Sequence, residues 1–520
     1  MKKFLTAWRT TIILCFVILG VALALRLFNL TYLPVFGDEA IYIRWAQVMR
    51  AEPTLRFLPL SDGKQPLFMW VVIPFLKIIS DPLLAGRVVS VLSGLATTAG
   101  IFATTYLIFK SKKAAIFSSF IYAVSPFGVF FDRLALADAM LSAFGVWTLF
   151  FSTLFVKTVR LDFAMITGFI LGGGLLTKSP ALFYALLLPS TWILSSFPQK
   201  KDKLILHLFK LGLFTLAALV IGYGMYNILR LGPNFHMVGL RNQDYVFPIS
   251  HIWENPKDPF IFHVKEIGEW LWMLGPSVLS ALVLIGAFFN LKKKPKEVLV
   301  LLAWAGIPLF AGAMYAKVFT ARYILFSLPY LIVLAGLALE LKGKLLQKAA
   351  ASLFVLFVLH SLFVNRLILF ELQRAPLPRS ERSGYLEEWT SGYGIRQVAD
   401  SLREIYQKEG RQIAVGTEGY FGTLPDGLMI YLNDLPEVKI FGVGIIIKDL
   451  PQELIDSKKA GNPTYFIINS TRYKGDPEAP GLKLLASYPK GVRPDGTREE
   501  LLFYEITEAS TQEEEVPAQQ

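Results

Sequence analysis

The chain has 520 residues, of which 54% are hydrophobic and only 18% are charged, and its formal net charge is +12. This composition excludes an ordinary soluble protein, and apolar runs long enough to cross a bilayer fill the chain from about residue 10 to residue 370. The positive charge does not indicate nucleic-acid binding, because a membrane protein retains Lys and Arg on its cytoplasmic side. The single cysteine, Cys15, permits no intrachain disulfide.

The apolar runs predict a polytopic α-helical membrane protein with about eleven transmembrane helices. The first run follows Lys2 and Lys3 and has no clear cleavage site after it, so we expect an uncleaved span with a cytoplasmic N-terminus. Residues 66–80 are apolar but short and contain two prolines, so we expect them to re-enter or lie in the interface. The expected spans are 10–28, 83–109, 114–130, 134–156, 163–176, 181–197, 205–229, 269–290, 298–316, 323–341 and 349–370.

Short basic clusters follow every second expected span. They lie at 110–113, 157–160, 199–203, 292–296 and 342–344. This alternation predicts a multi-pass protein of the plasma (inner) membrane, with these clusters inside and the loops 30–80 and 230–268 outside. Counting residues 66–80 as a further span would put all five clusters on the outer side, which favours the eleven-span arrangement.

The composition changes after the last expected span. Residues 1–372 are expected to form the transmembrane domain, and residues 384–506 alternate short apolar strands with helices. That alternation predicts a small extracytoplasmic α/β domain. Residues 507–520 are acidic and poor in apolar residues, so we expect a disordered tail.

Two adjacent acids, Asp38 and Glu39, follow the first expected span and so lie at the outer surface. A carboxylate near the membrane marks function more often than chance. The alternative is structural, because the residues that follow form a short predicted helix and an acid is a good helix cap. The pattern alone leaves both interpretations open.

A second acidic site comes from the sequence around Asp132, Arg133 and Asp138. Asp138 is expected about a turn and a half into the fourth span, near its outer end, where a buried carboxylate needs a partner. Arg133 is one candidate for that partner. The alternative to a reaction role is a structural Arg–Asp pair that closes the helix bundle.

Isolated basic residues also stand at expected outer ends of spans or in outer loops: Lys64, Lys178, Lys317 and Arg322. Basic residues are disfavoured on that side, so they require a reason. One reason is contact with lipid headgroups by side chains that reach the interface. The other is a bound phosphate, which Lys meets as a point charge and Arg as a fork. Their convergence on one face favours an anionic ligand.

These residues resemble those of the GT-C membrane glycosyltransferases, and most closely those of the protein O-mannosyltransferase and aminoarabinose (lipid A) transferase group. The resemblance covers roughly residues 10–370. It is carried by Gly37-Asp38-Glu39, Lys64-Gln65-Pro66-Leu67, the stretch from Arg133 to Asp138, Thr177-Lys178 and Arg322-Tyr323.

The resemblance implies a role for several residues. It makes Asp38 the catalytic base and matches Asp138 to the acid of the second outer loop. It matches Lys178 and Lys64 to lysines that contact the lipid phosphate, a task to which Arg322 and Arg133 are also assigned. Glu39 either positions the acceptor or caps the loop helix.

A departure from the family pattern bears on metals. The aminoarabinose transferases carry a metal-associated Glu directly before the lysine that corresponds to Lys64, and here that position is Gly63. The histidines of loop 230–268 also match no metal-site spacing. We therefore do not predict that metal, and we predict no cofactor, with a divalent metal remaining open as the alternative.

The predicted function is transfer of a sugar from a polyprenyl-phosphate donor to a hydroxyl acceptor, at the outer face of the lipid bilayer. The acceptor is a protein, a glycolipid or a cell-wall polymer, and the family chemistry implies inversion at the sugar carbon. The alternative is a transporter or flippase for a lipid-linked or anionic substrate. Such a protein usually carries paired half-repeats with broken helices, and the sequence shows no internal repeat.

Overall fold

The computed structural model describes residues 2–275 and 277–507. They form two compact units. The first unit comprises Met1–Leu30, Val48–Ser80 and Leu84–Pro378, and the second comprises Thr31–Gln47, Asp81–Leu83 and Arg379–Gln520. The segment that carries Asp38 and Glu39 therefore belongs to the same unit as the C-terminal part of the chain.

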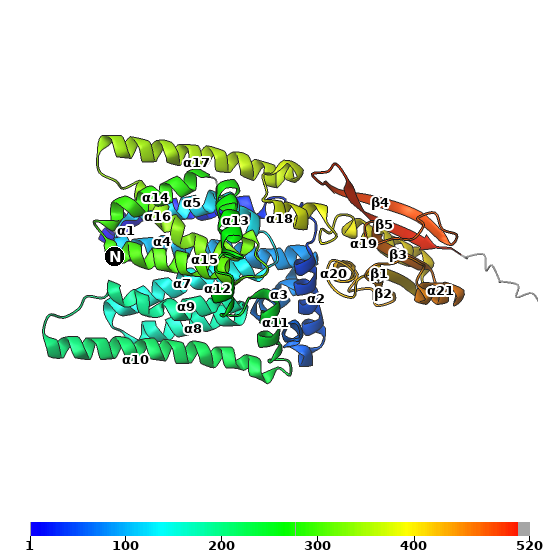
Figure 1. Cartoon of the computed structure of the whole chain (residues 1–520), viewed down its shortest axis with the longest axis horizontal. Coiled ribbons are helices and arrows are strands. Elements are labelled where there is room, and N and C mark those ends of the chain that lie inside the picture. The colour runs from blue at the N-terminus through cyan, green and yellow to red at the C-terminus, as the bar shows by residue number, and fades with distance from the viewer. Residues whose placement is uncertain (1, 276, 508–520) are drawn as a thin grey trace, which may run out of the picture. The chain divides into compact units, whose positions relative to one another are not determined.

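Among the described residues, seven helices are long and apolar enough to cross a membrane, as expected of a multi-pass membrane protein. They are α1 (Lys2–Leu27), α4 (Pro82–Phe109), α7 (Ala137–Thr158), α10 (Lys201–Tyr226) with the turn after it, α15 (Pro295–Tyr315), α16 (Leu328–Ala338) with the 3-10 turn η6 (Ala321–Ser327) before it, and α17 (Lys344–Phe370). The seven α-helices named here are labelled in Figure 1.

Three further expected spans are shorter or broken in the structure. The run 114–130 is divided into α5 (Lys112–Val124) and α6 (Pro126–Phe131), because Ser125 precedes a proline and has an extended backbone, with ψ of 124°. The helix α8 (Leu161–Thr177) and the group η3 (Ser179–Ala181), α9 (Leu182–Leu187) and η4 (Leu188–Leu194) are apolar but short. The count of eleven spans is therefore not reproduced by helix length.

The expected boundary between loop 230–268 and the eighth span is wrong. The loop contains α11 (Met237–Tyr245) and α12 (His251–Glu254), and α13 already begins within it, spanning Phe260–Met273. The next helix, α14 (Ser277–Leu291), is bent from α13 by 104°. Taken as one broken span, this pair raises the number of candidate spans to eight. The sequence signal for the bend is Gly275-Pro276, since proline disfavours helix in the residue before it.

The short apolar run after Lys64 forms α3 (Leu67–Ile78), with Pro74 inside it. Its 12 residues rise by about 18 Å at 1.5 Å per residue, which is less than the thickness of a bilayer core. Elsewhere in the first unit, small residues allow helices to meet closely. A Cβ at Gly168 of α8 would lie 2.7 Å from the carbonyl oxygen of Ala218 in α10, and the two helices run side by side in Figure 1.

The second unit contains a five-stranded sheet in the order β2-β1-β3-β5-β4. The strands β1 (Ile413–Glu418), β2 (Val438–Gly444) and β3 (Thr464–Asn469) are parallel, while β5 (Arg498–Ile506) is antiparallel to β3 and to β4 (Leu482–Val492). The helices are α18 (Arg379–Arg382), α19 (Ile395–Glu409), α20 (Asp426–Tyr431) and α21 (Gln452–Lys459). The predicted small α/β sheet is thus present.

The helix α2 (Gly37–Ala51) begins in the second unit and ends in the first. Beneath one part of the sheet, Leu454, Phe466, Ile468 and Tyr504 form an apolar core. The helix α21 and the strand β4 were not among the elements predicted from the sequence. The expected tail at 507–520 lies outside the described residues apart from Thr507.

Candidate functional site

The partner of Asp138 is Lys178. The ammonium of Lys178, directly after α8, lies 2.6 Å from Oδ1 of Asp138, which is in the first turn of α7. The Asp138 side chain is 6% exposed and that of Lys178 is 23% exposed. The N-terminus of α7 supplies unpaired N–H groups and a positive helix dipole, which stabilise a carboxylate at this position. Arg133, the partner suggested by the sequence, is therefore not the residue that pairs with Asp138.

Two cations share one aromatic ring beside this pair. The Lys178 ammonium lies 4.4 Å from the centre of the Tyr323 ring, and the Arg322 guanidinium lies 5.3 Å from the same ring. Both residues are half-buried, and cation–π attraction holds them near one another despite their like charges. The structure thus brings together two of the predicted phosphate-binding residues.

Lys64 is joined to the same region through its neighbour in the chain. Gln65 donates a hydrogen bond to Oγ of Ser179, the residue after Lys178, at 2.8 Å. The Lys64 ammonium donates to the hydroxyl of Tyr245 at 3.0 Å and lies 4.5 Å from the centre of its ring. The segments that carry Lys64 and Lys178 are therefore in direct contact.

The loop after α10 covers the segment that precedes Lys64. Gly63 has a φ of 69°, and a Cβ there would lie 2.7 Å from Cβ of Arg241 in α11. Arg241 pairs with Asp62 at 2.8 Å and with Asp244 at 2.7 Å. On the other side of the loop, Lys317 donates to the carbonyl oxygen of Gln243 at 2.6 Å.

These contacts bear on the metal of the aminoarabinose transferases. Gly63 offers no ligand at the position where those enzymes carry a Glu, and the neighbouring Asp62 is engaged by a guanidinium. The residues present do not fit that metal, and no step below is routed through one. In the described part of the chain, no three His, Cys, Asp or Glu side chains form a cluster with metal-ligand geometry.

Arg133 occupies a different position from the other predicted phosphate ligands. Its guanidinium donates to the carbonyl oxygens at the C-terminal end of α1 and just beyond it: Leu25, Arg26, Phe28 and Asn29. A cation at a helix C-terminus satisfies carbonyls that lack helical partners. Next to it, Arg26 and Asp132 form a fully buried ion pair of 2.9 Å. The structural alternative, an Arg–Asp pair that closes the bundle, is thus realised by Arg26 and Asp132.

The two acids of the first loop have different surroundings in the second unit. Glu39 is fully buried, and its Oε2 accepts a hydrogen bond of 3.0 Å from the backbone N–H of Phe36. This is the contact of a capping box, in which an acid at the third helical position reaches back to the residue before the helix. Glu39 therefore caps α2, while Asp38 lies half-buried in the same first turn.

The second unit also contains a buried cluster of charges. The ammonium of Lys490 in β4 is almost fully buried and donates to the carbonyl oxygen of Glu388 at 3.1 Å. Burial lowers the pKa of Lys490 to about 8, against the opposing attraction of Glu499, Glu418 and Glu388. Arg493 pairs with Glu388 at 2.8 Å. The cluster fastens β4 to the segment around Glu388.

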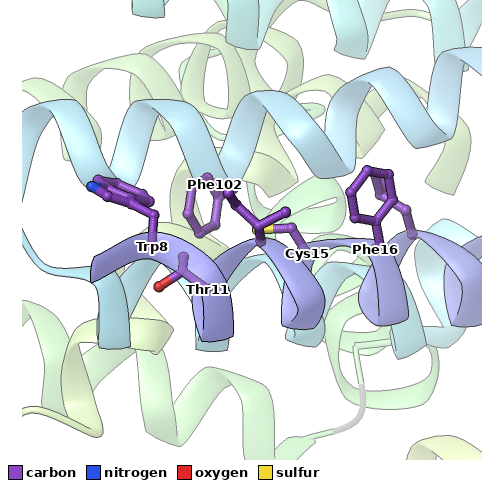
Figure 2. A pocket seen from close by; sticks show the side chains of 7 residues that line it. Trp8, Thr11, Cys15, Phe16 and Phe102 are labelled. Atoms are coloured by element: carbon purple, nitrogen blue, oxygen red, sulfur yellow. The ribbon is translucent and has the colours of Figure 1, made fainter. Parts of the chain in front are cut away.

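An apolar groove lies along α1, where that helix faces Phe102 of α4 (Figure 2). Its lining residues are Trp8, Thr11, Ile12, Cys15, Phe16, Leu19 and Phe102. None of these side chains carries a charge, so the groove has no group that binds phosphate or serves as a base near neutral pH. We therefore assign the candidate phosphate site to the residues around Lys178 in the first unit, and treat Asp38 separately as a residue of the second unit.

Sequence reasoning assigned no role to the aromatic residues of the site. Tyr245 and Tyr323 hold the cations, and Ser179 joins the two lysine segments. The signal was present only in part, because Tyr323 follows Arg322 directly, whereas Tyr245 lies in a loop whose packing the sequence does not reveal.

Comparisons with known proteins place the fold. Residues 63–224 match the family model described as dolichyl-phosphate-mannose-protein mannosyltransferase. A sequence comparison with curated proteins finds no match.

Among solved structures, ArnT from Cupriavidus metallidurans in the apo state superposes with a TM-score of 0.54 and 15% identity, covering 96% of this chain and 98% of that chain. The same protein bound to undecaprenyl phosphate gives a TM-score of 0.53 and 16% identity over 96% and 98% of the two chains. The archaeal oligosaccharyltransferase AglB from Archaeoglobus fulgidus was solved in complex with an inhibitory peptide and a dolichol-phosphate. It superposes with a TM-score of 0.50 and 13% identity, covering 96% of this chain and 75% of that chain. The chain therefore has the GT-C fold, as the sequence predicted.

Proposed function

We propose that this protein is a membrane glycosyltransferase that moves a sugar from a polyprenyl-phosphate donor to a hydroxyl acceptor. The observation that carries the proposal is the group formed by Lys178, Arg322 and Tyr323, with Lys64 joined to it through Gln65 and Ser179. Half-buried cations held by aromatic rings can bind the phosphate of a lipid-linked sugar. The phosphate would pair with the ammonium and guanidinium groups while the isoprenoid chain remains in the lipid.

The proposed chemistry needs one base and one anion-binding group. Asp38 accepts the proton of the acceptor hydroxyl as its oxygen attacks the anomeric carbon of the sugar. The bond between that carbon and the phosphate oxygen breaks, and polyprenyl phosphate departs with one additional negative charge. Lys178, Lys64 and Arg322 stabilise that charge. In-line displacement inverts the configuration at the sugar carbon.

In this proposal Asp138 acts on Lys178 and not on the acceptor. Its 2.6 Å contact fixes the position of the ammonium before the donor binds. Glu39 fixes the helix that begins beside Asp38 through its contact with the Phe36 N–H. We do not assign Arg133 to the phosphate, because four backbone carbonyls occupy its guanidinium.

The comparisons support the donor class. ArnT was solved with undecaprenyl phosphate and AglB with a dolichol-phosphate, and the matching family model names a dolichyl-phosphate-mannose donor. We extend that class to this chain, with the sugar and the acceptor left open among protein, glycolipid and cell-wall polymer hydroxyls. The same matches favour an enzyme over the transporter alternative.

We further propose that the chain crosses the plasma membrane eleven times, with the short elements α5–α6, α8 and η3–η4 completing the set. The N-terminus and the basic loops then lie in the cytoplasm, and the transmembrane domain extends over residues 1–372. The α/β domain of residues 384–506 lies outside. The acids and isolated cations of the proposed site all fall on the outer side in this arrangement.

The experiment is a donor screen with the full-length protein in vesicles. Polyprenyl-phosphate sugars are offered with peptide, glycolipid and polymer acceptors, and released polyprenyl phosphate and glycosylated product are measured together. We expect equal amounts of both, with an inverted anomeric configuration in the product by NMR. Retained configuration would contradict the single-displacement mechanism, and transport of intact donor without cleavage would support the transporter alternative.

A further inference from the structure

The segment before α2 is paired with a segment of the C-terminal part of the second unit. The N–H of Gly37 donates to the carbonyl oxygen of Thr390 at 3.1 Å, and the N–H of Gly392 donates to that of Val35 at 2.9 Å. These two bonds enclose an antiparallel bridge between Phe36 and Ser391. The residue next to Asp38 is thus hydrogen-bonded to the α/β domain.

Side chains tighten this pairing. The ring of Phe36 lies 4.4 Å from that of Tyr385, centre to centre. A Cβ at Gly392 would lie 2.4 Å from the carbonyl oxygen of Val35, so only glycine permits this approach. A Cβ at Gly37 would lie 3.0 Å from Oγ1 of Thr423, in the loop between β1 and α20. The start of α2 is therefore enclosed between two segments of the α/β domain.

The rest of α2 is held to the same domain about two to three turns later. Arg44 donates to Oδ1 of Asn433 at 2.7 Å, and Gln47 donates to the carbonyl oxygen of Ile430 at 2.9 Å. Both contacts lie in or just after α20. The loop that begins α20 leaves the carboxyl end of the parallel strand β1, the edge of an α/β sheet where functional groups are commonly positioned.

The segment that pairs with Gly37, around Thr390 and Gly392, is itself bonded to the sheet. Arg493 at the end of β4 pairs with the carboxylate of Glu388 at 2.8 Å, and Lys490 donates to the carbonyl oxygen of the same residue. Glu388 is two residues from Thr390 and four from Gly392. A continuous series of contacts thus leads from β4 to the residue that precedes Asp38.

We infer that the C-terminal α/β domain is a positioning frame for Asp38, with Gly37, Thr390 and Gly392 as its positioning residues. This inference rests on the proposed function, in which Asp38 is the base. A base must lie within a fraction of an ångström of its working position, and misplacement by about 1 Å costs on the order of a hundredfold in rate. The frame fixes the backbone on which the carboxylate stands.

The decisive test is a pair of substitutions that create and remove one clash. In Gly37→Ala the new Cβ meets Thr423 Oγ1 at 3.0 Å, so Thr423 or the start of α2 must shift by a few tenths of an ångström, and we expect part of that shift in α2. Alanine is a better helix former than glycine, so the change does not weaken α2 itself. Thr423→Ala deletes the opposing hydroxyl, whose oxygen is buried without a hydrogen-bond partner among the described residues.

We expect Gly37→Ala to lower kcat about tenfold while the KM for the donor stays unchanged, because the proposed donor cations lie in the other unit. Thr423→Ala alone is expected to keep near wild-type kcat, and the double variant to regain it. Gly384→Ala is the matched control, since its Cβ would meet Phe36 at an ordinary 3.7 Å. Non-additivity of this kind isolates the contact between the two positions.

Wild-type kcat in Gly37→Ala, or a double variant as slow as the single, would overturn the inference and leave the assignment of Asp38 intact. Full activity of Asp38→Asn would instead overturn the proposed base, so the two failures are distinguishable. If Gly37→Ala does not accumulate in membranes, Tyr385→Leu loosens the contact with Phe36 without adding a clash. It is expected to lower kcat with an unchanged donor KM, and unchanged kcat there contradicts the frame.

Discussion

The ammonium of Lys178 lies 2.6 Å from Oδ1 of Asp138, across the gap between the end of α8 and the start of α7. The pair is mostly buried, and the ring of Tyr323 beside Lys178 also contacts Arg322. A lysine whose ammonium is held in place by a carboxylate and an aromatic ring is positioned to bind an anion. The first prediction follows from that relationship.

Lys178→Gln should raise the KM for the donor and lower kcat, because it removes a charge that we propose stabilises the departing phosphate. Asp138→Asn should cause a smaller loss, since the ammonium remains but is no longer fixed. The two changes act through one contact, so the double variant should be no slower than Lys178→Gln, with a coupling of about 1–3 kcal/mol. Steady-state kinetics of the four proteins measure this, and additive losses would show that the pair does not act as a unit.

Lys64→Gln should lower kcat/KM for the donor about tenfold or more, because a hydrogen bond to a charged group contributes about 1.5–3 kcal/mol. Tyr245→Phe removes only the hydroxyl that accepts from Lys64 and should have a smaller effect. The control is Lys257→Gln, an exposed lysine in loop 230–268, which also carries Tyr245. Equal losses in the Lys64 and Lys257 variants would mean that only the overall charge of the two loops matters.

Buried Lys490 predicts a pH dependence of stability. Its pKa is lowered from 10.5 to about 8 by burial, so between these pH values the unfolded chain binds more protons at this site than the folded chain. The free energy of unfolding should therefore rise with pH across this window. The full gain is about 3 kcal/mol, at about 1.4 kcal/mol for each pKa unit.

Lys490→Met is the control for that measurement, because it keeps the length of the side chain and removes the titration. The comparison with this variant isolates the contribution of the lysine, because every other titrating group is the same in both proteins. The stability of the wild type should rise relative to the variant from pH 8 to pH 10.5 in denaturant titrations of the full-length protein in detergent. Parallel pH profiles would refute the assignment.

The proposed topology is tested with single cysteines in a Cys15→Ala background. Glu52→Cys follows α2, and Tyr420→Cys lies in an exposed loop of the second unit. Both should react with a membrane-impermeant maleimide applied from outside. Lys292→Cys, in a predicted cytoplasmic cluster, should react only after permeabilisation. The reverse pattern would invert the whole arrangement.

Much of the fold was predictable because its signals are local. Apolar length gave the long helices, and alternating short strands and helices gave the α/β domain. The strand β4 was missed because exposed charged and polar side chains interrupt its pattern, and Pro489 lies within it. The break between α13 and α14 was missed although Gly275-Pro276 marks it, because the apolar run continues through the dipeptide.

The sequence predicted which residues belong to the candidate site better than it predicted which of them contact one another. Isolated charges identified Lys64, Asp138, Lys178 and Arg322, but nothing local to the sequence tells which side chains pair across 40 residues. Arg133 was named as a candidate partner of Asp138 because the two residues are close in sequence. It instead binds the carbonyls that end α1, more than 100 residues away. Long-range packing decides such contacts, whereas the cap formed by Glu39 is local, since its partner Phe36 is three residues away.

The most direct test of the account is the turnover of Asp38→Asn in vesicles with polyprenyl-phosphate sugar and acceptor. Asparagine keeps the shape of the side chain but accepts no proton, so kcat should fall by about 10²–10⁴-fold. Donor binding, measured separately by equilibrium titration, should stay near that of the wild type because the proposed phosphate contacts remain. Turnover close to wild type would contradict the role of Asp38 as the base.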